Sequence, residues 1–309
     1  MKKVAALVKD TFRDFSDDKC SRMAAALSYY MVFSLPPLLI IILAIVGFFV
    51  DPADAQGRFV QQLNGLVGPQ GAEAMRTMIE QANRPQGGIM AVVGVVTLLL
   101  GATGAFAQLQ ETLNTAWEVK PDPRAGGVKQ FLTKRLLSFG MIMVIAFLLL
   151  VSFVMSALVA AFGDLLVGYL GGAGAAIGQA VQIVVGLVVT WLVFALMFKV
   201  LPDARIGWRD VWVGALVTAV LFTIGRFLIG LYLGNSNSAN AFGAAAALAI
   251  IFVWLYYAAN IVFLGAEFTQ VWVRHHGRTI EPEAGATKVR TMEVVAPHHD
   301  FSRRTQKGL

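Results

Sequence analysis

Residues 177–201 read IGQAVQIVVGLVVTWLVFALMFKVL, a run in which Lys199 is the only charged side chain. A helix needs about 20 predominantly apolar residues, at about 1.5 Å each, to cross the hydrocarbon core of a bilayer. This run is long enough and apolar enough to do so. It therefore predicts a transmembrane helix and sets the class of the whole protein.

The rest of the chain repeats this pattern. Of the 309 residues, 57% are hydrophobic and only 14% are charged, whereas a soluble globular chain carries about 25% charged residues. We expect an all-α fold, a polytopic membrane bundle of about six transmembrane helices. The predicted spans are roughly 23–50, 87–107, 137–162, 177–201, 211–233 and 243–270.

Basic residues are distributed unevenly between these spans. Six precede the first span, five lie in 108–136, three in 199–209 and seven from Arg274 onward, while the alternate loops hold only three. Cytoplasmic loops carry the excess of Lys and Arg in membrane proteins. The asymmetry predicts that both termini are cytoplasmic, and it explains the net charge of +6 without a nucleic-acid partner.

Three regions flank or interrupt the predicted transmembrane domain, 23–278. Residues 1–22 carry apolar side chains at three- and four-residue spacing, which predicts an amphipathic helix on the inner leaflet. Residues 51–86 hold two amphipathic stretches and predict an extracytoplasmic helical hairpin. Residues 279–309 lose apolar periodicity and mix charged residues with Gly and Pro, so we expect a disordered cytoplasmic tail.

Arg226 is the one basic residue deep inside a predicted span. Placing Arg at a bilayer centre costs about 2.5–3.5 kcal/mol on insertion scales, which makes it a candidate for substrate binding. Its side chain either faces a cavity or snorkels to the outer headgroups about two turns away. Pro36 and Pro37 are further candidates because they kink or break the first span near Leu35, where the freed carbonyls line a polar cavity or pack against protein.

Two polar helix faces are candidates as well. Tyr256, Asn260 and Glu267 lie on one face of the last span. An ionised Glu267 would need a partner inside the membrane, unless it sits at the inner headgroup level. A seam of small and polar side chains on the second span either packs on a neighbour or lines a cytoplasmic crevice. Its polar members near the inner interface are Gln108, Glu111 and Asn114.

The sequence offers no signature of an enzyme. Cys20 is the only cysteine, so an internal disulfide and a sulfur-based zinc site are excluded. The four histidines occur as two adjacent pairs, which seldom converge on one ion. No nucleophile elbow or phosphate-binding loop is present in the sequence. We expect neither a metal site nor a cofactor, and no catalysis.

Several ordered motifs resemble the YihY/BrkB family of bacterial inner-membrane proteins over roughly residues 10–275. They are Ala24–Tyr30 leading into Phe33–Pro37, Leu113–Trp117, Trp208–Val211 with Gly214 and Ala215, Gly225-Arg226, Leu231–Gly234, and Trp254–Tyr257 through Gly265–Phe268. The resemblance implies a multi-pass protein with six spans in the bacterial inner (cytoplasmic) membrane. The family's labels imply an old assignment as ribonuclease BN, a role in virulence, or lipid export. The ribonuclease label finds no support here, because a zinc nuclease needs clustered His and Asp ligands.

Two functional hypotheses follow. The first is a transporter-like or flippase-like protein that moves or presents an anionic lipid-type amphiphile for envelope biogenesis, with Arg226 attracting the headgroup. The second is a non-transporting scaffold or partner subunit in envelope biogenesis or virulence, which binds an envelope protein through residues 51–86. Both hypotheses place the chain in the lipid bilayer, allow a homo-oligomer and exclude nucleic acid as a partner.

Overall fold

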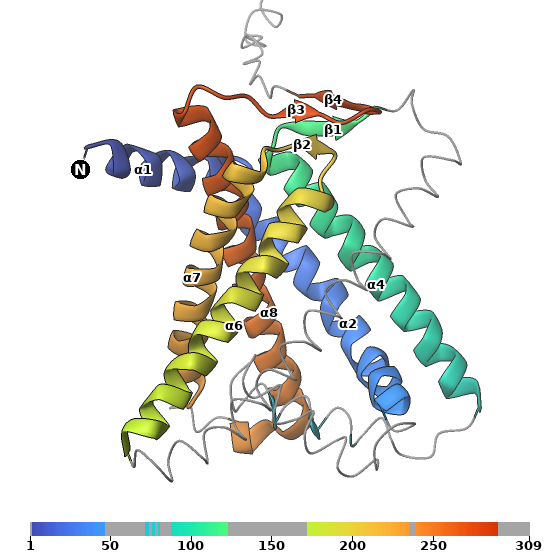
Figure 1. Ribbon diagram of the computed structural model, residues 1–309. Coiled ribbons are helices and arrows are strands. Elements are labelled where there is room, and N and C mark those ends of the chain that lie inside the picture. The colour runs from blue at the N-terminus through green and yellow to red at the C-terminus, as the bar shows by residue number, and fades with distance from the viewer. Residues whose placement is uncertain are drawn as a thin grey trace, which may run out of the picture.

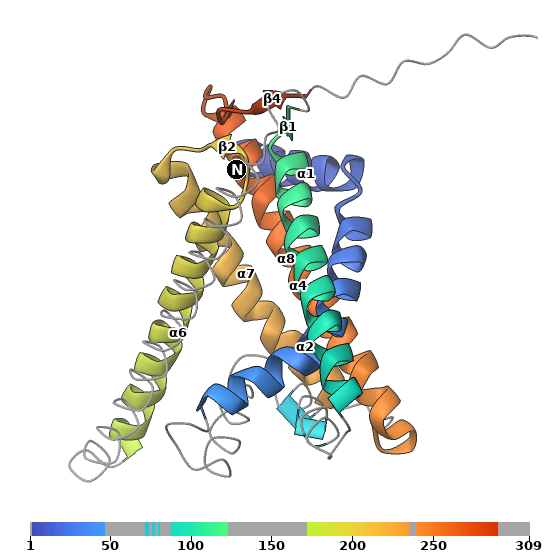
Figure 2. The same cartoon turned by 90° about the vertical axis from the view of Figure 1, so that its right-hand side faces the viewer.

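The computed structural model describes residues 2–46, 88–122, 172–234 and 239–289, together with a few positions between 72 and 80. Its helices are α1 (Lys2–Asp17), α2 (Cys20–Val46), α4 (Gly88–Ala116), α6 (Gly172–Val200), α7 (Trp208–Gly234) and α8 (Ala239–His275). The long helices converge at one end of the molecule, where four short strands lie, and spread apart away from it (Figures 1 and 2). We call this end the strand end. The prediction of a helical membrane fold is confirmed.

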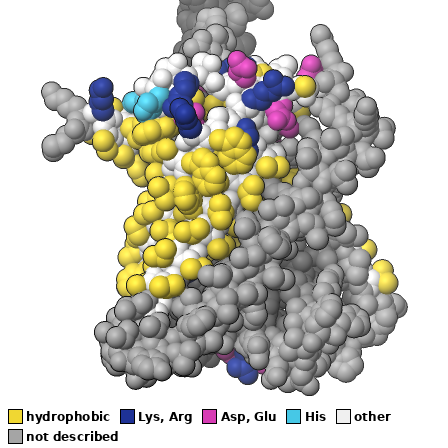
Figure 3. Space-filling model, in the orientation of Figure 1, with side chains coloured by type: hydrophobic (Ala, Val, Ile, Leu, Met, Phe, Trp, Pro, Cys, Tyr) yellow, Lys and Arg dark blue, Asp and Glu magenta, His cyan; other side chains and the backbone are white. Residues whose placement is uncertain are grey.

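The predicted spans correspond to observed helices. Three described helices are long and apolar enough to cross a membrane: Gly178–Val200, Trp208–Ile229 and Leu248–His275. They correspond to the fourth, fifth and sixth predicted spans, while α2 and α4 cover most of the first two. On the face seen in Figure 3, hydrophobic side chains cover the flank of the bundle below a rim of charged ones. The third predicted span, 137–162, lies outside the described residues, so the number of spans and the side of the termini stay predictions.

Small residues set the distance between neighbouring helices. Gly214 and Gly265 face threonines across the contact between α7 and α8: Thr269 packs over Gly214, and Thr218 packs over Gly265. Each threonine hydroxyl donates to a carbonyl one turn back on its own helix, Thr218 to Gly214 at 2.8 Å and Thr269 to Gly265 at 2.7 Å. We call these four residues the glycine–threonine interlock. It brings the two backbones close, as small residues do between membrane helices.

The second span contributes a similar contact. Gly101 on α4 lies against Ser34 of α2, where a methyl group added at position 101 would be 2.9 Å from Ser34 Cβ. The Tyr30 ring occupies the corresponding space over Gly104. These contacts show that Gly101 and Gly104, two small residues of the predicted seam on the second span, pack against α2. α2 itself runs as one helix through Pro36 and Pro37, and its axis turns in its second half (Figure 2), in accord with a kink rather than a chain break.

Helix α1 lies across the end of the bundle rather than along it (Figure 1). Its exposed side carries Val4, Val8 and Phe12, which are 65%, 45% and 58% exposed. Its other side rests on α8. The amphipathic helix is therefore observed, although it ends at Asp17 and not at residue 22. Lys19 adopts a φ of 56°, in the left-handed region that cannot continue an α-helix, so the chain turns there before α2 begins.

The exposed apolar side of α1 has the geometry of an interfacial membrane helix. Phe12→Ser is expected to loosen α1, because a buried Phe side chain is worth about 1.5–3 kcal/mol relative to an exposed one. Hydrogen exchange of residues 2–17 in lipid nanodiscs should accelerate about tenfold or more. Ser16→Ala, an exposed change on the same helix, is the control. Equal exchange of the Phe12→Ser variant and the wild type would show that this side does not contact lipid.

The strand end contains two short antiparallel ladders. β1 (Val119–Pro121) pairs with β4 (Ala286–Lys288), and β2 (Ala204–Arg205) pairs with β3 (Glu281–Pro282). Further backbone bonds join Val289 N to Glu118 O at 2.8 Å and Glu283 N to Asp203 O at 2.9 Å. The turn between β3 and β4 has a φ of 91° at Gly285, a conformation that glycine adopts readily.

This arrangement corrects the prediction of a disordered tail from residue 279 onward. The segment lacks apolar periodicity, but its backbone groups find partners in chain segments that follow α4 and α6. Ile280 is buried at the same place. Composition does not reveal strands that are stabilised by distant partners. The remainder of the predicted tail, 290–309, and nearly all of the predicted hairpin, 51–86, lie outside the described residues.

Candidate functional site

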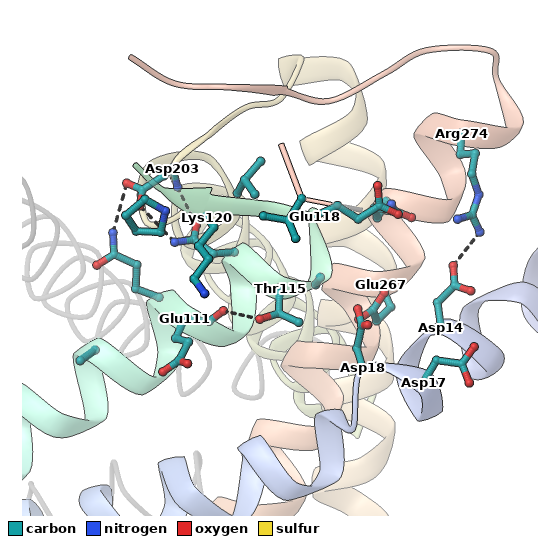
Figure 4. A pocket seen from close by; sticks show the side chains of 18 residues that line it. Asp14, Asp17, Asp18, Glu111, Thr115, Glu118, Lys120, Asp203, Glu267 and Arg274 are labelled. Atoms are coloured by element: carbon teal, nitrogen blue, oxygen red, sulfur yellow. Dashed lines mark hydrogen bonds and ion pairs between the residues drawn. The ribbon is translucent and has the colours of Figure 1, made fainter. Parts of the chain in front are cut away.

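A pocket of about 790 Å³ opens at the strand end. The turn between α1 and α2, the last turns of α4 with β1, and the final third of α8 form its walls (Figure 4). Its volume lies within the range of about 300–1,000 Å³ that small-molecule sites occupy. The pocket holds several of the predicted polar side chains.

The pocket is strongly acidic. Seven carboxyl groups and only two basic side chains line it. The acidic residues are Asp14, Asp17, Asp18, Glu111, Glu118, Asp203 and Glu267, and the basic ones are Lys120 and Arg274. Arg274 is engaged with Asp14 at 2.6 Å. A ligand with a positively charged group therefore fits this lining better than an anion does.

Glu267 forms the deepest acidic part of the pocket. Its side chain is 1% exposed, and the Cys20 thiol donates to its Oε1 at 3.3 Å. Figure 4 shows its carboxyl group next to that of Asp18. The sequence leaves room for a solvated Glu267 at the headgroup level, but the structure buries it because the α1–α2 turn covers this side of α8.

Asp18 has an unusual environment for a carboxyl group in a turn. Burial raises the pKa of Asp18 from 3.8 to about 6, and its hydrogen bond with Glu267 offsets part of this rise. Neighbouring carboxylates raise it further, namely Asp14, Glu118 and Asp17. Asp18 thus changes its charge closer to neutral pH than an ordinary aspartate.

Asp18→Asn is expected to stabilise the protein at neutral pH but not in acid. The folded pKa lies above the unfolded one, so the folded state binds more protons between about pH 4 and pH 6, and stability falls as pH rises through this window. Asparagine cannot ionise and removes this loss. The melting temperature of the variant relative to wild type should be unchanged near pH 4 and higher above about pH 6. Asp17→Asn is the control, and a difference that does not vary with pH would contradict the expectation.

One side of the pocket is held by a buried reciprocal pair. Asn114 Nδ2 donates to Asp203 Oδ2 at 3.1 Å, and the backbone N–H of Asp203 donates to Asn114 Oδ1 at 2.8 Å. Gln110 Nε2 reaches the other carboxylate oxygen at 3.4 Å. These bonds fix the end of α4 to the turn between α6 and α7. They also fix where β1 and β2 begin.

The predicted site residues do not all meet in this pocket. Glu111, Asn114 and Glu267 line it together, so the polar ends of the second and sixth spans do share a cavity. Gln108 instead donates to Thr112 on its own helix, at 3.4 Å. Asn260 donates to the carbonyl of Tyr256 one turn back at 2.7 Å, and neither residue belongs to the pocket lining.

Arg226 is also outside the pocket lining. It is half-buried on α7, next to Gly225, which packs against the Tyr257 hydroxyl of α8. The side chains of Pro36 and Pro37 lie outside what the structure describes. The pocket therefore brings together only some of the predicted site residues, and Arg226 is not among them.

Sequence reasoning missed most of the acidic lining. Asp14, Asp17 and Asp18 belong to the end of the amphipathic helix, and Glu118 and Asp203 belong to loops, where charged residues are ordinarily solvated. One feature of the sequence could have identified them: each of these acids lies shortly before or after a predicted span, on the predicted cytoplasmic side of the membrane. Only the folded arrangement shows that they face one space.

The fold and the pocket define a polytopic helical membrane protein with an acidic cavity at one end. The family model described as Virulence factor BrkB matches residues 11–289, and the chain belongs to this family, as the sequence motifs predict.

Relatives carry only a general description. A "UPF0761 membrane protein" of Teredinibacter turnerae is 30% identical over 276 residues, which cover 86% of this chain and 60% of that protein. A second one, of Psychromonas ingrahamii, is 28% identical and is covered over 84% of both chains. The chain thus spans three fifths of the first relative and most of the second. No solved structure matches the chain.

Proposed function

We propose that this chain is a transporter-like protein of the bacterial inner membrane that moves or presents a lipid-type amphiphile for envelope biogenesis. The pocket at the strand end would accept the polar headgroup. The observation that carries this proposal is the depth of the pocket: its lining extends from the exposed β1 residue Lys120 to Glu267, which lies within the apolar segment Leu248–His275. A polar space that enters a membrane-spanning segment suits a ligand with a polar end and an apolar end. The proposal assigns no catalysis to the pocket.

The charge of the pocket refines the substrate class. The sequence hypothesis gives the amphiphile an anionic headgroup that Arg226 attracts, whereas seven carboxyl groups around the pocket favour a headgroup with an ammonium group. Gln270 Oε1 also lines the pocket region as a buried acceptor without a donor among the described residues. An ammonium N–H would satisfy it. Lys120 lies exposed on the rim, where it suits the phosphate of a zwitterionic lipid, whereas Arg274 is already paired with Asp14.

Proteoliposomes test this proposal directly. Purified protein is reconstituted with fluorescent analogues of phosphatidylethanolamine or phosphatidylglycerol, and movement between leaflets is followed by chemical quenching from outside. We expect the ethanolamine lipid to move about tenfold faster than the glycerol lipid, a ratio that corresponds to about 1.4 kcal/mol of selective binding. Glu111→Gln should reduce this selectivity, whereas Glu281→Gln, an exposed change outside the pocket, should not. Absence of movement with pure protein would overturn the transport proposal and favour the scaffold hypothesis.

A further inference from the structure

The contact between α1 and α8 consists of three charged or titratable pairs in a row. His275 Nε2 lies 2.9 Å from Asp10 Oδ2, and Arg274 Nη2 lies 2.6 Å from Asp14 Oδ2. The carboxyl group of Asp18 faces that of Glu267, and Figure 4 shows this pair and the Arg274–Asp14 pair. We call these three pairs the α1–α8 latch. The groups around it are Asp10, Arg13, Asp14 and Asp17 on α1, Asp18 in the turn, Cys20 on α2, Glu118 after α4, and Glu267, Arg274 and His275 on α8.

We propose that the α1–α8 latch is a pH-sensitive device that holds α1 and the pocket wall on α8 in acid and releases them as pH rises. The action of the latch does not depend on which ligand the pocket binds. Two of its three pairs respond to protons, and they respond in the same direction. The third pair joins the Arg274 guanidinium to the Asp14 carboxylate at 2.6 Å.

The carboxyl pair contributes the first response. Glu267 is 1% exposed, and its direct neighbours are the Cys20 thiol and the Asp18 carboxyl group rather than a basic side chain. An ionised carboxylate in a poorly solvated contact without a basic partner is costly, so the contact is most stable when both carboxyl groups are protonated. When Asp18 loses its proton, the α1–α2 turn carries a negative charge against α8 and the contact weakens.

The histidine pair contributes the second response. The Asp10–His275 contact is an ion pair only while the imidazole is protonated, and both side chains are partly exposed, at 28% and 29%. Its contact with His275 lowers the pKa of Asp10, so Asp10 stays ionised in mild acid. Loss of the imidazole proton removes the charge from the His275 side of this pair and weakens the same helix contact.

The latch also forms part of the pocket. Asp14, Asp17 and Asp18 line the cavity from the α1 side, and Glu267 and Arg274 line it from α8. Release of α1 would therefore widen the pocket at one wall. Loss of the Asp18 proton would also add negative charge to the pocket lining.

Hydrogen exchange of residues 2–17 in nanodiscs, corrected for intrinsic rates, tests the latch in the full chain. Wild-type protection should be about tenfold greater near pH 5.5 than near pH 8, a ratio that corresponds to a loss of about 1.4 kcal/mol in the stability of the α1 contact. Asp18→Asn should raise protection near pH 8, and His275→Gln should lower it near pH 5.5. The double variant should show almost no pH dependence. Glu281→Gln, an exposed carboxyl change outside the pocket and the latch, should show the wild-type pH dependence.

Equal wild-type protection at both pH values, or unchanged pH dependence in the double variant, would overturn the latch. A second measurement uses the wild-type protein first, so its main result does not depend on whether a variant folds. Infrared difference spectra of the wild type between the same pH values should show loss of a protonated carboxylic acid signal, and Asp18→Asn should remove it. A spectrum without that signal overturns the carboxyl response. Neither measurement requires lipid movement, so failure of the transport proposal leaves both readouts intact.

Discussion

Gly265→Ala is expected to separate α7 from α8 and to cost at least about 1–3 kcal/mol of stability, the usual range for overpacking a tight core. A methyl group at this position would be 2.8 Å from Thr218 Cβ and 2.9 Å from its Cγ2. Thr218 cannot move aside easily, because it is completely buried and its hydroxyl donates to Gly214 O. Thermal unfolding of the purified protein in detergent measures the loss.

Gly186→Ala on α6 is the matched control, since no atom lies within 4 Å of the added methyl group. It should leave the melting temperature unchanged or slightly higher, because alanine is the better helix former. Exchanging the small residue between the helices, as Gly265→Ala with Thr218→Gly, should recover part of the loss. A Gly265→Ala protein as stable as Gly186→Ala would show that α7 and α8 can shift apart without cost.

Asn114→Ala is expected to destabilise the strand end by about 1–3 kcal/mol or more, the cost of leaving a buried charged group short of hydrogen bonds. The change removes both the 3.1 Å bond to the Asp203 carboxylate and the acceptor of the Asp203 N–H. Asn114 and Asp203 are each 5% exposed, so water cannot readily replace the amide.

Thermal unfolding and hydrogen exchange of residues 201–206 measure this effect. Gln110→Ala is the matched control, because its bond to the same carboxylate is longer, 3.4 Å, and its loss should cost less. Asn114 also lines the pocket. Hydrogen exchange near Asp203 is therefore the readout that reports on the reciprocal pair itself. If the two variants lose equal stability, the reciprocal pair is not what fixes the end of α4.

The sequence predicts the transmembrane helices well because hydrophobic length is a local property. The run 177–201 needs no knowledge of its neighbours to be assigned to a membrane, and α6 contains it almost entirely. The amphipathic helix before the first span is equally local, and only its end differs. The helix ends where Lys19 adopts a left-handed backbone conformation. Lysine has no preference for this conformation, so the sequence does not predict the end.

The pocket is less accessible to sequence reasoning because its walls come from distant segments. Spacing along the last span groups Tyr256, Asn260 and Glu267 on one face, yet only Glu267 reaches the cavity. The other two are neighbours within their own helix turn. The cost of a charge in lipid makes Glu267 and Arg226 candidates from the sequence. It does not say that they occupy different places.

The two strand ladders have a consequence for how the protein is made. β1 leaves the ribosome long before β4, as the 167-residue separation between Thr287 and Lys120 illustrates. Until the last helix has been inserted, β1 and β2 present unpaired edges of the kind that invite pairing with other chains. Residues 281–288 close both edges at once. A chain whose synthesis stops before them would carry its membrane helices but keep two open edges, and cellular quality control would have a feature by which to recognise it.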